Sequence, residues 1–351
     1  MYQPGRPIDE VARELGLDPS GVIKMASNEN PLGPSPRALA AMRDLLPHLH
    51  LYPDGSAFHL KKRLAERLGL VPENLILGNG SNEIIEFVGH ALMRPGAEVV
   101  VSQYCFAIYP IVASMMGAKT VVVPAKGYAH DLGAMGRAIT PATTVVFVAN
   151  PNNPTGTLAS PEEVLALVES VPPGVLLVMD EAYIEFLERP VDLVARVREG
   201  RAANLLLMRT FSKIHGLAGL RLGYGIGSRE TIGVLEKVRQ PFNINSLAQA
   251  AAQAALEDVG HVEATRRNNR EGLAYWEREL RARGIEYVPS HANFLLVRVG
   301  KGSEVCAALQ KRGVITRPMG GYGLPEHIRI SVGTPAENAR CLGALLEVHR
   351  G

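Results

Sequence analysis

The chain has 351 residues, with 37 basic and 35 acidic side chains, so its formal net charge is +2. Charged residues make up 21% and hydrophobic residues 46% of the sequence, which excludes long disordered tails, collagen-like repeats and strongly charged arms. Because no block of lysine or arginine stands out, we expect no nucleic-acid partner, and the length indicates about two domains.

The longest apolar stretches, such as Val145–Ala149, extend over about five residues, whereas a membrane-spanning helix needs roughly 20. The first residues contain no hydrophobic region and no small-residue cleavage site of a secretion signal. The cysteines Cys105, Cys306 and Cys341 are scattered and form no C-x-x-C pair, which is typical of reduced, packed thiols. The sequence therefore predicts a cytoplasmic protein that does not associate with a membrane.

The first 30 residues are predicted to form an arm that contains one short helix around Ile8–Leu15, followed by a polar turn from Asn28 to Pro34. From about residue 74, short apolar runs alternate with amphipathic segments such as Glu83–Met93. The runs that indicate buried strands are Leu75–Leu77, Val99–Val101, Thr120–Val123, Val145–Val148, Val175–Met179 and Leu205–Met208. This alternation predicts an α/β domain over residues 31–240, with a mostly parallel sheet covered by helices on both faces.

The last third of the chain has a different pattern, in which long helical stretches precede short strands. The predicted elements are helices at residues 247–257 and 262–283, a strand at 294–299, a helix at 303–312, a strand at 328–331 and a helix at 335–349. These elements predict a smaller α+β domain over residues 241–351. We expect the arm, residues 1–30, to pack with this small domain or with a partner subunit.

Several familiar kinds of site are missing from the sequence. It contains no H-E-x-x-H metal motif, so we expect no metal, and it contains neither a G-x-S-x-G elbow nor a G-x-x-x-x-G-K-[ST] phosphate loop. The glycines between Gly223 and Gly227 lack the third position of the dinucleotide-binding fingerprint, which leaves a nicotinamide-dependent dehydrogenase without support.

Polar motifs instead follow four of the predicted strands, at the end of the sheet where α/β proteins bind ligands. They are Gly78–Glu83, Pro151–Gly156, Asp180–Tyr183 and Thr210–Lys213, with Arg221 eight residues after the lysine. The motifs supply an anion-binding helix start, an amide, a carboxylate and a lysine. Pyridoxal 5′-phosphate requires this combination: a lysine for its aldehyde, a carboxylate beside its pyridine nitrogen, and N–H donors with a cation for its phosphate.

With these residues, the sequence resembles the fold-type I pyridoxal-phosphate-dependent aminotransferases of class I and II, and most closely the histidinol-phosphate aminotransferase family. The resemblance covers nearly the whole chain, through motifs such as N-E-N-P, G-N-G-S-N-E, P-N-N-P-T-G, D-E-A-Y, T-F-S-K and I-R-I-S-V-G-T. It implies a large α/β domain with a seven-stranded, mostly parallel sheet, a smaller α+β domain, and a homodimer with a shared active site.

The resemblance implies three catalytic residues: Lys213, Asp180 and Tyr183. Lys213 would hold the cofactor as a Schiff base and then carry a proton between the substrate Cα and the cofactor. Asp180 would pair with the pyridine nitrogen. Tyr183 and Asn153 would hydrogen-bond the phenolic oxygen of the cofactor.

The resemblance also implies a seat for the cofactor phosphate. Ser212, Arg221 and the backbone at Ser81 and Asn82 would bind it, together with Tyr52 of the partner subunit. Many members of the family have aspartate where this chain has Asn82, so one negative charge is missing near the phosphate.

Phe106 would stack on the cofactor ring, at a position where some relatives have tyrosine. For the substrate, the resemblance implies that Arg329 binds the α-carboxylate of the amino donor, since the planar guanidinium matches a carboxylate. Arg317 would bind the substrate phosphate, and Asn30 is also implied to bind substrate.

The function implied first is transamination between L-histidinol phosphate and 2-oxoglutarate, which gives imidazole-acetol phosphate and glutamate in histidine biosynthesis. Two alternatives remain open. One is an aromatic amino-acid aminotransferase, because an imidazole and a phenyl ring make similar demands on a pocket. The other is a threonine-phosphate decarboxylase, which also takes a phosphorylated substrate.

Overall fold

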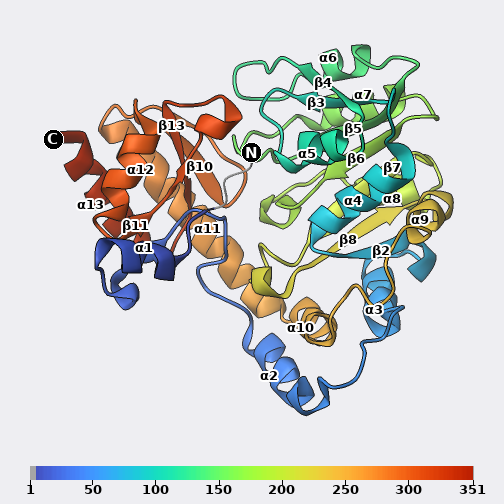
Figure 1. The fold of residues 1–351 in the computed structure, drawn as a ribbon, viewed down its shortest axis with the longest axis horizontal. Coiled ribbons are helices and arrows are strands. Elements are labelled where there is room, and N and C mark those ends of the chain that lie inside the picture. Colours follow the sequence, from blue (N-terminus) through green and yellow to red (C-terminus); the bar gives the residue numbers. More distant parts are fainter. Residues whose placement is uncertain (1–4, 351) are drawn as a thin grey trace.

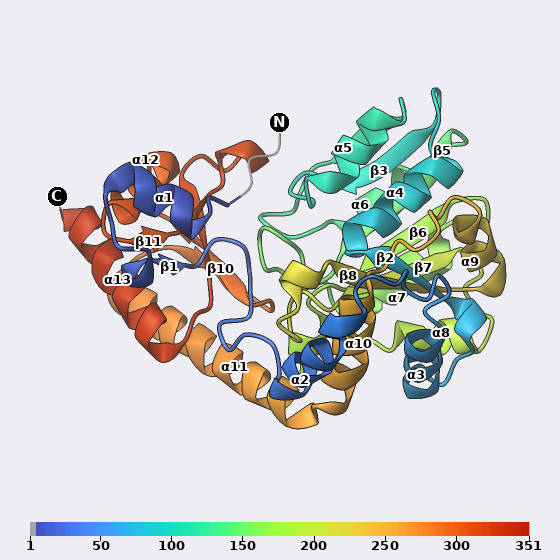
Figure 2. The same cartoon turned by 60° about the horizontal axis from the view of Figure 1, so that its bottom comes forward.

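The computed structural model describes residues 5–350, which form a large and a small unit lying side by side (Figure 1). The long helix α11 (Val259–Ala282) runs from one unit to the other, as a second view makes plain (Figure 2). Within the described part of the chain, no helix is long and apolar enough to cross a membrane.

The large unit is built on a seven-stranded sheet with the strand order β2-β8-β7-β6-β5-β3-β4. Its strands are β2 (Leu75–Asn79), β3 (Glu98–Ser102), β4 (Lys119–Val123), β5 (Thr143–Ala149), β6 (Leu176–Asp180), β7 (Leu205–Thr210) and β8 (Leu222–Gly227). All neighbours are parallel except β8, which is antiparallel to both β2 and β7. The predicted fold class and six of the seven strands are confirmed.

The sequence analysis missed β8, in which Gly223, Gly225 and Gly227 occupy every second position. Glycine disfavours strands, so propensity argues against this segment. The packing explains the glycines: a Cβ atom on Gly223 would lie 2.4 Å from the backbone nitrogen of Ser81, and one on Gly225 would lie 2.9 Å from Ile76 Cγ2. The strand forms because its glycines allow close approach of neighbouring segments.

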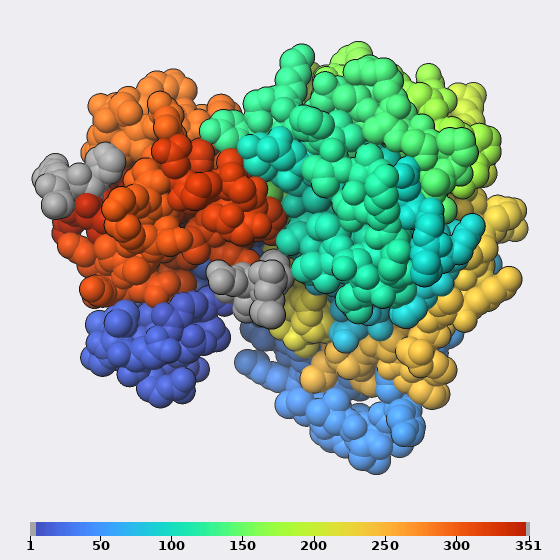
Figure 3. Space-filling model, turned by 45° about the horizontal axis from the view of Figure 1, so that its top comes forward, coloured from blue at the N-terminus to red at the C-terminus, as the bar shows by residue number. Residues whose placement is uncertain are grey.

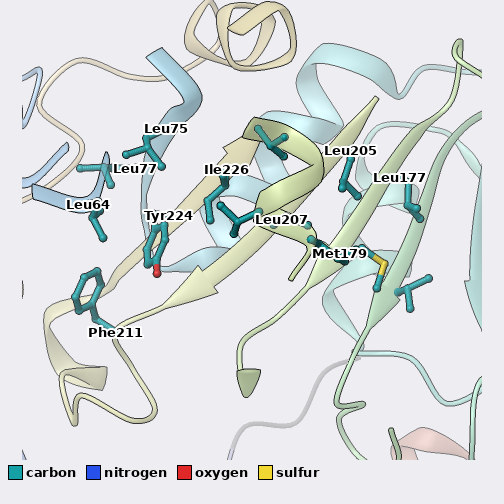
Figure 4. Packing of buried hydrophobic residues seen from close by; sticks show 14 of the residues in the cluster. Leu64, Leu75, Leu77, Leu177, Met179, Leu205, Leu207, Phe211, Tyr224 and Ile226 are labelled. Atoms are coloured by element: carbon teal, nitrogen blue, oxygen red, sulfur yellow. The ribbon is translucent and has the colours of Figure 1, made fainter. Parts of the chain in front are cut away.

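Helices cover both faces of the sheet, because alternate side chains of each buried strand point to opposite faces. Leu177 and Met179 join one core, and Leu176 and Val178 join the other. Figure 4 shows the first core around Leu207, Phe211 and Tyr224. The helices that contribute to the first core are α3 (Phe58–Leu68), α6 (Leu132–Arg137), α7 (Pro161–Ser170), α8 (Leu193–Arg198) and α10 (Ser246–Glu257). The helices on the second are α4 (Ser81–Leu92), α5 (Ile108–Met115) and α9 (Arg229–Glu236).

Local side-chain bonds set the start of several helices. At α7 the Ser160 hydroxyl accepts from the Glu163 N–H at 3.2 Å, and the Glu163 carboxylate accepts from the Ser160 N–H at 2.9 Å, which together form a capping box. Helix α11 begins before the predicted residue 262, because the Asp258 carboxylate caps it through the His261 N–H.

The small unit has a four-stranded antiparallel sheet with the order β12-β13-β10-β9. Its elements are β9 (Tyr287–Val288), β10 (Phe294–Arg298), β12 (Arg317–Pro318), β13 (His327–Ser331), α12 (Gly302–Gln310) and α13 (Pro335–Arg350). They pack around the buried Trp276 of α11. Register pairs Arg317 of β12 directly with Arg329 of β13.

The N-terminal arm, with α1 (Ile8–Leu15) and β1 (Ile23–Lys24), lies against the small unit (Figure 3). Strand β1 pairs in parallel with β11 (Val314–Ile315). Helix α10 packs on α3 and on α2 (Pro36–Leu45), and its alanines belong to the core of the large unit. In packing, the small unit therefore begins at α11, later in the chain than the predicted boundary at residue 241.

Candidate active site

A cavity of about 400 Å³ lies where the carboxyl ends of β5, β6 and β7 meet the arm and the small unit. Cavities of this size hold small organic ligands. It collects residues that are far apart in the sequence but were all predicted to belong to one site. Those that line it are Ser81, Asn82, Phe106, Asn153, Asp180, Tyr183, Ser212, Lys213, Arg221, Arg317 and Arg329.

Lys213 lies in the loop that follows β7, and its Nζ donates a hydrogen bond to the Ser27 carbonyl at 3.1 Å. Burial, together with the nearby Arg329 guanidinium, lowers the pKa of Lys213 to about 8, while the Asp180 carboxylate acts in the opposite direction. A lysine in this environment exposes a neutral, nucleophilic amine at a much lower pH than a surface lysine does.

Asp180 ends β6 and is only 6% exposed. One carboxylate oxygen accepts from the Tyr109 hydroxyl at 2.7 Å, and the other accepts from the Ala182 N–H at 3.1 Å. Burial raises the pKa of Asp180, whereas these two hydrogen bonds favour its ionised form. A cationic N–H group from a ligand would relieve the cost of this buried charge.

Tyr109 was missed by the sequence analysis, although it is fully buried and touches the central carboxylate. Its ring packs edge-on against Phe106, 5.6 Å away between centroids. Phe106 lies two residues before α5 and Tyr109 lies in its first turn, so both rings come from one short segment of the chain.

The arm contributes polar groups that the sequence analysis did not single out. The Asn28 amide donates to the Tyr183 hydroxyl at 2.9 Å, and the Ser27 carbonyl accepts from Lys213. The φ angle of Asn28 is 56°, a left-handed conformation that asparagine tolerates better than most residues. The arm thus forms one wall of the cavity.

Two arginines enter the cavity from the small unit. Arg317 and Arg329 are directly opposite each other on neighbouring antiparallel strands, so their side chains leave the sheet on the same face. Arg329 donates to the Asn153 side-chain oxygen and, at 2.8 Å, to the Ala26 carbonyl. Both arginines are more than nine-tenths buried, so two positive charges are held inside one cavity.

The opposite end of the cavity is shaped for an anion. Helix α4 begins at Ser81, and its first N–H groups lie beside the closely approaching Gly223. A Cβ atom on Gly80 would lie 2.5 Å from the Arg221 guanidinium, so only glycine leaves room for this arginine. Helix N-termini attract anions through free N–H groups and the helix dipole, and Arg221 adds a full charge.

Two predicted site residues do not line the cavity. Tyr52 is 85% exposed, and its ring contacts Phe242 at 5.1 Å between centroids. The Asn30 amide donates to the Ile214 carbonyl at 3.0 Å and to the Thr265 hydroxyl at 3.1 Å. Asn30 therefore ties the arm to the loop next to Lys213, and within the described chain its side chain holds structure together.

Known proteins match this chain over nearly its whole length. The family model described as aminotransferase class I and II matches residues 20–345. The chain is 51% identical to the histidinol-phosphate aminotransferase of Akkermansia muciniphila, over 99% of this chain and 95% of that protein. It is 50% identical to histidinol-phosphate aminotransferase 2 of Pseudomonas fluorescens, over 99% and 94% of the two chains.

A solved structure shares the whole fold. The crystal structure of the histidinol-phosphate aminotransferase of Sinorhizobium meliloti, in complex with pyridoxal 5′-phosphate, superposes with a TM-score of 0.90. The match covers 99% of this chain and 96% of that one, with 29% sequence identity.

Proposed function

Because the chain belongs to the class I and II aminotransferase family, we propose that it is a pyridoxal-phosphate-dependent enzyme that transfers the amino group of L-histidinol phosphate to 2-oxoglutarate. The products are imidazole-acetol phosphate and glutamate. One observation carries the proposal: a single cavity holds the Lys213 amine, the Asp180 carboxylate and two neighbouring arginines.

The cavity fits pyridoxal 5′-phosphate at both ends. The cofactor, when bound, supplies an aldehyde that forms a Schiff base with amines and a protonated ring that withdraws electrons. Asp180 would pair with the ring nitrogen, which offers its buried carboxylate a cation. The α4 N-terminus at Ser81 and Asn82, with Ser212 and Arg221, would hold the phosphate, and the close approach at Gly80 and Gly223 leaves space for that contact.

Residues in the walls of the cavity would make the remaining contacts with the cofactor. Phe106 would lie on one face of the ring. Asn153 and Tyr183 would donate to the phenolic oxygen. Both side chains are already held in position, because Asn153 accepts from Arg329 and Tyr183 accepts from Asn28.

Lys213 acts as nucleophile and as proton carrier. Its lowered pKa makes the amine available near neutral pH, both to bind the cofactor and to accept the proton from the substrate Cα. Arg329 contributes to the lowered pKa of Lys213, so the residue that would bind the substrate carboxylate also makes the Lys213 amine easier to deprotonate.

The two arginines suit substrates with two different anions. Arg329, anchored by the Ala26 carbonyl, would bind the carboxylate of glutamate or 2-oxoglutarate as a planar fork. Arg317 would bind the phosphate of histidinol phosphate, a substrate that has no carboxylate.

The enzyme works as a homodimer in this proposal, with Tyr52 of the partner subunit reaching the cofactor phosphate. A surface patch supports the assignment: among the large apolar side chains that the structure leaves exposed, several are close in sequence to Tyr52 or touch it. They are Leu46, Leu49, Leu51, Phe58 and Phe242. Patches of this kind mark protein interfaces.

The test of substrate choice is a set of half-reactions followed by visible absorbance. L-Histidinol phosphate, L-phenylalanine, L-tyrosine and L-threonine phosphate are each mixed with the cofactor-loaded enzyme, and their specificity constants are compared. We expect histidinol phosphate to convert the enzyme fastest. Faster conversion by phenylalanine or tyrosine would support the aromatic enzyme instead, and release of CO₂ from threonine phosphate would support the decarboxylase.

Arg317→Ala tests how the phosphate is recognised. We expect kcat/KM for histidinol phosphate to fall by about two orders of magnitude or more, as for loss of a buried charge-assisted bond, while the half-reaction with glutamate falls much less. The matched control is Arg312→Ala, an exposed arginine on the same unit that pairs with Glu347. Equal losses for both substrates would contradict a phosphate-binding role for Arg317.

A further inference from the structure

A second cavity, of about 1100 Å³, lies behind the candidate active site and shares no lining residue with it. Its walls come from α3, from the loop after β6, from β7 and from helix α11. The two cavities use opposite sides of the same segments. Asp180, Tyr183 and Lys213 line the first, whereas Glu185 and His215 line the second.

The floor of the second cavity contains a buried ion pair that needs no further partner. Arg209 of β7 donates to the Glu181 carboxylate at 2.8 Å, and the Glu181 side chain is only 3% exposed. These two charges neutralise each other. Glu185 is a further acid of the lining, together with Glu188, Glu263 and Glu277.

Glu185 lies in the short loop after Tyr183, and within residues 5–350 its Oε2 is buried without a hydrogen-bond partner. The adjacent Arg266 does not satisfy it: the Arg266 Nε donates to the backbone carbonyl of Glu185 at 2.6 Å, and its NH1 pairs with Glu263. Burial raises the pKa of Glu185 to about 7, although the Arg209 charge opposes that shift. An unpartnered buried acceptor of this kind is costly unless a ligand donates to it.

A second acceptor faces the same cavity. Asn269 of α11 is 6% exposed and uses its amide N–H on the Ala292 carbonyl at 3.0 Å, while its side-chain oxygen accepts from no described residue. His215 is 8% exposed, and its buried Nδ1 also has no partner among the described residues. Burial lowers the pKa of His215 to about 3, so this imidazole is neutral and adds no positive charge.

The rim of the cavity carries charges of both signs. Arg189, in the loop after β6, and Arg270, next to Asn269 on α11, are both exposed and line the opening. Glu188 and Glu263 are exposed on the same lining, so an anionic end would be bound by Arg189 or Arg270 individually and not by a uniformly positive rim.

We propose that the second cavity is a binding site for a small zwitterion, whose guanidinium or ammonium group donates to Glu185 and Asn269 while its carboxylate faces Arg189 and Arg270. A planar guanidinium with several N–H donors suits two separate acceptors. The site is independent of the reaction proposed for the first cavity, so either assignment stands if the other fails.

The probe is L-arginine, and L-citrulline is its uncharged counterpart of nearly the same shape. Binding to the cofactor-loaded enzyme is measured by equilibrium dialysis with labelled amino acid at pH 8. We expect saturable binding of L-arginine that is about tenfold or more tighter than that of L-citrulline, because only the former places a charge-assisted donor at Glu185. Absence of saturable binding, or equal binding of the two, would overturn the proposal.

Three variants locate the site. Glu185→Gln and Asn269→Ala are each expected to weaken L-arginine binding, the former by about tenfold or more. Arg329→Ala, in the first cavity, is expected to leave it unchanged. Loss of binding in Arg329→Ala alone would place the probe in the first cavity and refute the proposal. Retention of the visible absorbance of bound cofactor and an unchanged unfolding temperature show that each variant is folded.

The pH dependence gives a second readout. The groups that face the Glu185 carboxyl are Arg209, Glu181 and Arg266, and the first two form a salt bridge with each other. Loss of the Glu185 proton between pH 6 and 8 is therefore expected to strengthen L-arginine binding by about tenfold in the wild type. The same titration is expected to be flat in Glu185→Gln, and a parallel pH dependence in both proteins would show that another group is responsible.

Discussion

Lys213 shows how one residue acquires its chemistry from its surroundings. The amine lies in a cavity with Arg329 on one side and the Ser27 carbonyl on the other, and its pKa falls from 10.5 to about 8. Burial and a neighbouring cation both penalise the charged form, so the proton leaves more easily. The sequence identifies this lysine by its motif, whereas its acidity depends on groups from other parts of the chain.

The pH dependence of cofactor uptake tests that environment. A neutral amine is the form that attacks an aldehyde, so the rate constant for pyridoxal phosphate binding to the cofactor-free enzyme should rise with pH and level off above about pH 8. Nα-acetyl-lysine in free solution is the reference, with a midpoint near its ordinary pKa of about 10.4. Stopped-flow absorbance measures both. A midpoint near pH 10 in the protein would contradict the lowered pKa.

Tyr109 is a positioning residue, because it acts on the Asp180 carboxylate through a hydrogen bond of 2.7 Å. Tyr109→Phe removes the donor, raises the pKa of Asp180 and weakens its pairing with a ring nitrogen. We expect the dissociation constant of pyridoxal phosphate to rise by about five- to thirtyfold, which corresponds to one lost buried hydrogen bond. Equilibrium fluorescence or absorbance titration of the cofactor-free protein measures it.

Tyr104→Phe is the control for that experiment, since Tyr104 lies in the same segment and stacks on Tyr128 outside the cavity. We expect its cofactor affinity to match the wild type. If Tyr109→Phe also bound the cofactor normally, the hydrogen bond to Asp180 would have no role in holding the ring.

At the level of elements, the contact between β8 and the start of α4 shapes the proposed phosphate seat. The strand and the helix approach so closely at Gly223 that a side chain there would meet the Ser81 nitrogen at 2.4 Å. A helix start pressed against a strand in this way keeps its N–H groups fixed toward the cavity. The glycines that made β8 hard to predict from the sequence thus also allow the close approach that shapes the proposed phosphate seat.

Gly223→Ala is expected to push α4 away from β8. We expect a loss of about 1–3 kcal/mol in the free energy of unfolding, typical of overpacking, and a weaker affinity for pyridoxal phosphate. Chemical denaturation and cofactor titration measure the two effects. Gly233→Ala, on the exposed side of α9 where nothing lies within 4 Å of the new Cβ, is the matched control and should leave both unchanged or raise stability slightly.

The pairing of β12 with β13 is another contribution of whole elements. The sequence does not indicate that β12 pairs with β13, because β12 consists only of Arg317 and Pro318. Their antiparallel register brings Arg317 opposite Arg329, and both side chains then face the cavity. Two anions of one reaction can therefore be bound by neighbouring residues of one small sheet.

For the whole molecule, the arm and the two units each supply part of one site. The arm gives Ser27 and Asn28, the large unit gives Asp180 and Lys213, and the small unit gives Arg329. A movement of one unit relative to the other would change the distance from the substrate arginines to the lysine. Helix α11 joins both units, which makes it the element through which such a movement would be transmitted (Figure 2).

A mixed-dimer experiment tests whether two chains share the site. Tyr52→Phe or Tyr52→Ala, whichever is less active, and Lys213→Ala are purified separately, then mixed, exchanged and assayed for transamination. In a mixed dimer one site has both Tyr52 and Lys213 intact, so activity should return to as much as about a quarter of the wild type. Mixing either variant with itself is the control. Failure to regain activity, with subunit exchange verified, would argue against a shared site.

The fold class, the cofactor and the loops that line the cavity could all be predicted from the sequence. Buried parallel strands such as Val145–Val148 and Leu205–Met208 were predicted correctly, because burial on both faces leaves a continuous apolar run. The motifs around Asp180 and Lys213 were identifiable for a related reason. They follow those strands directly, and the ends of parallel strands must meet at one edge of the sheet.

The further groups that surround those motifs become visible only in the folded chain. The Tyr109 bond to Asp180, the Asn28 bond to Tyr183, the place of Asn30 and the glycine strand β8 all depend on contacts between segments distant in the chain. Local propensity and periodicity depend on residues that are close in sequence, so they do not predict such contacts. The lowered pKa of Lys213 and the second cavity behind it have the same origin, because burial and electric field are properties of the packed molecule.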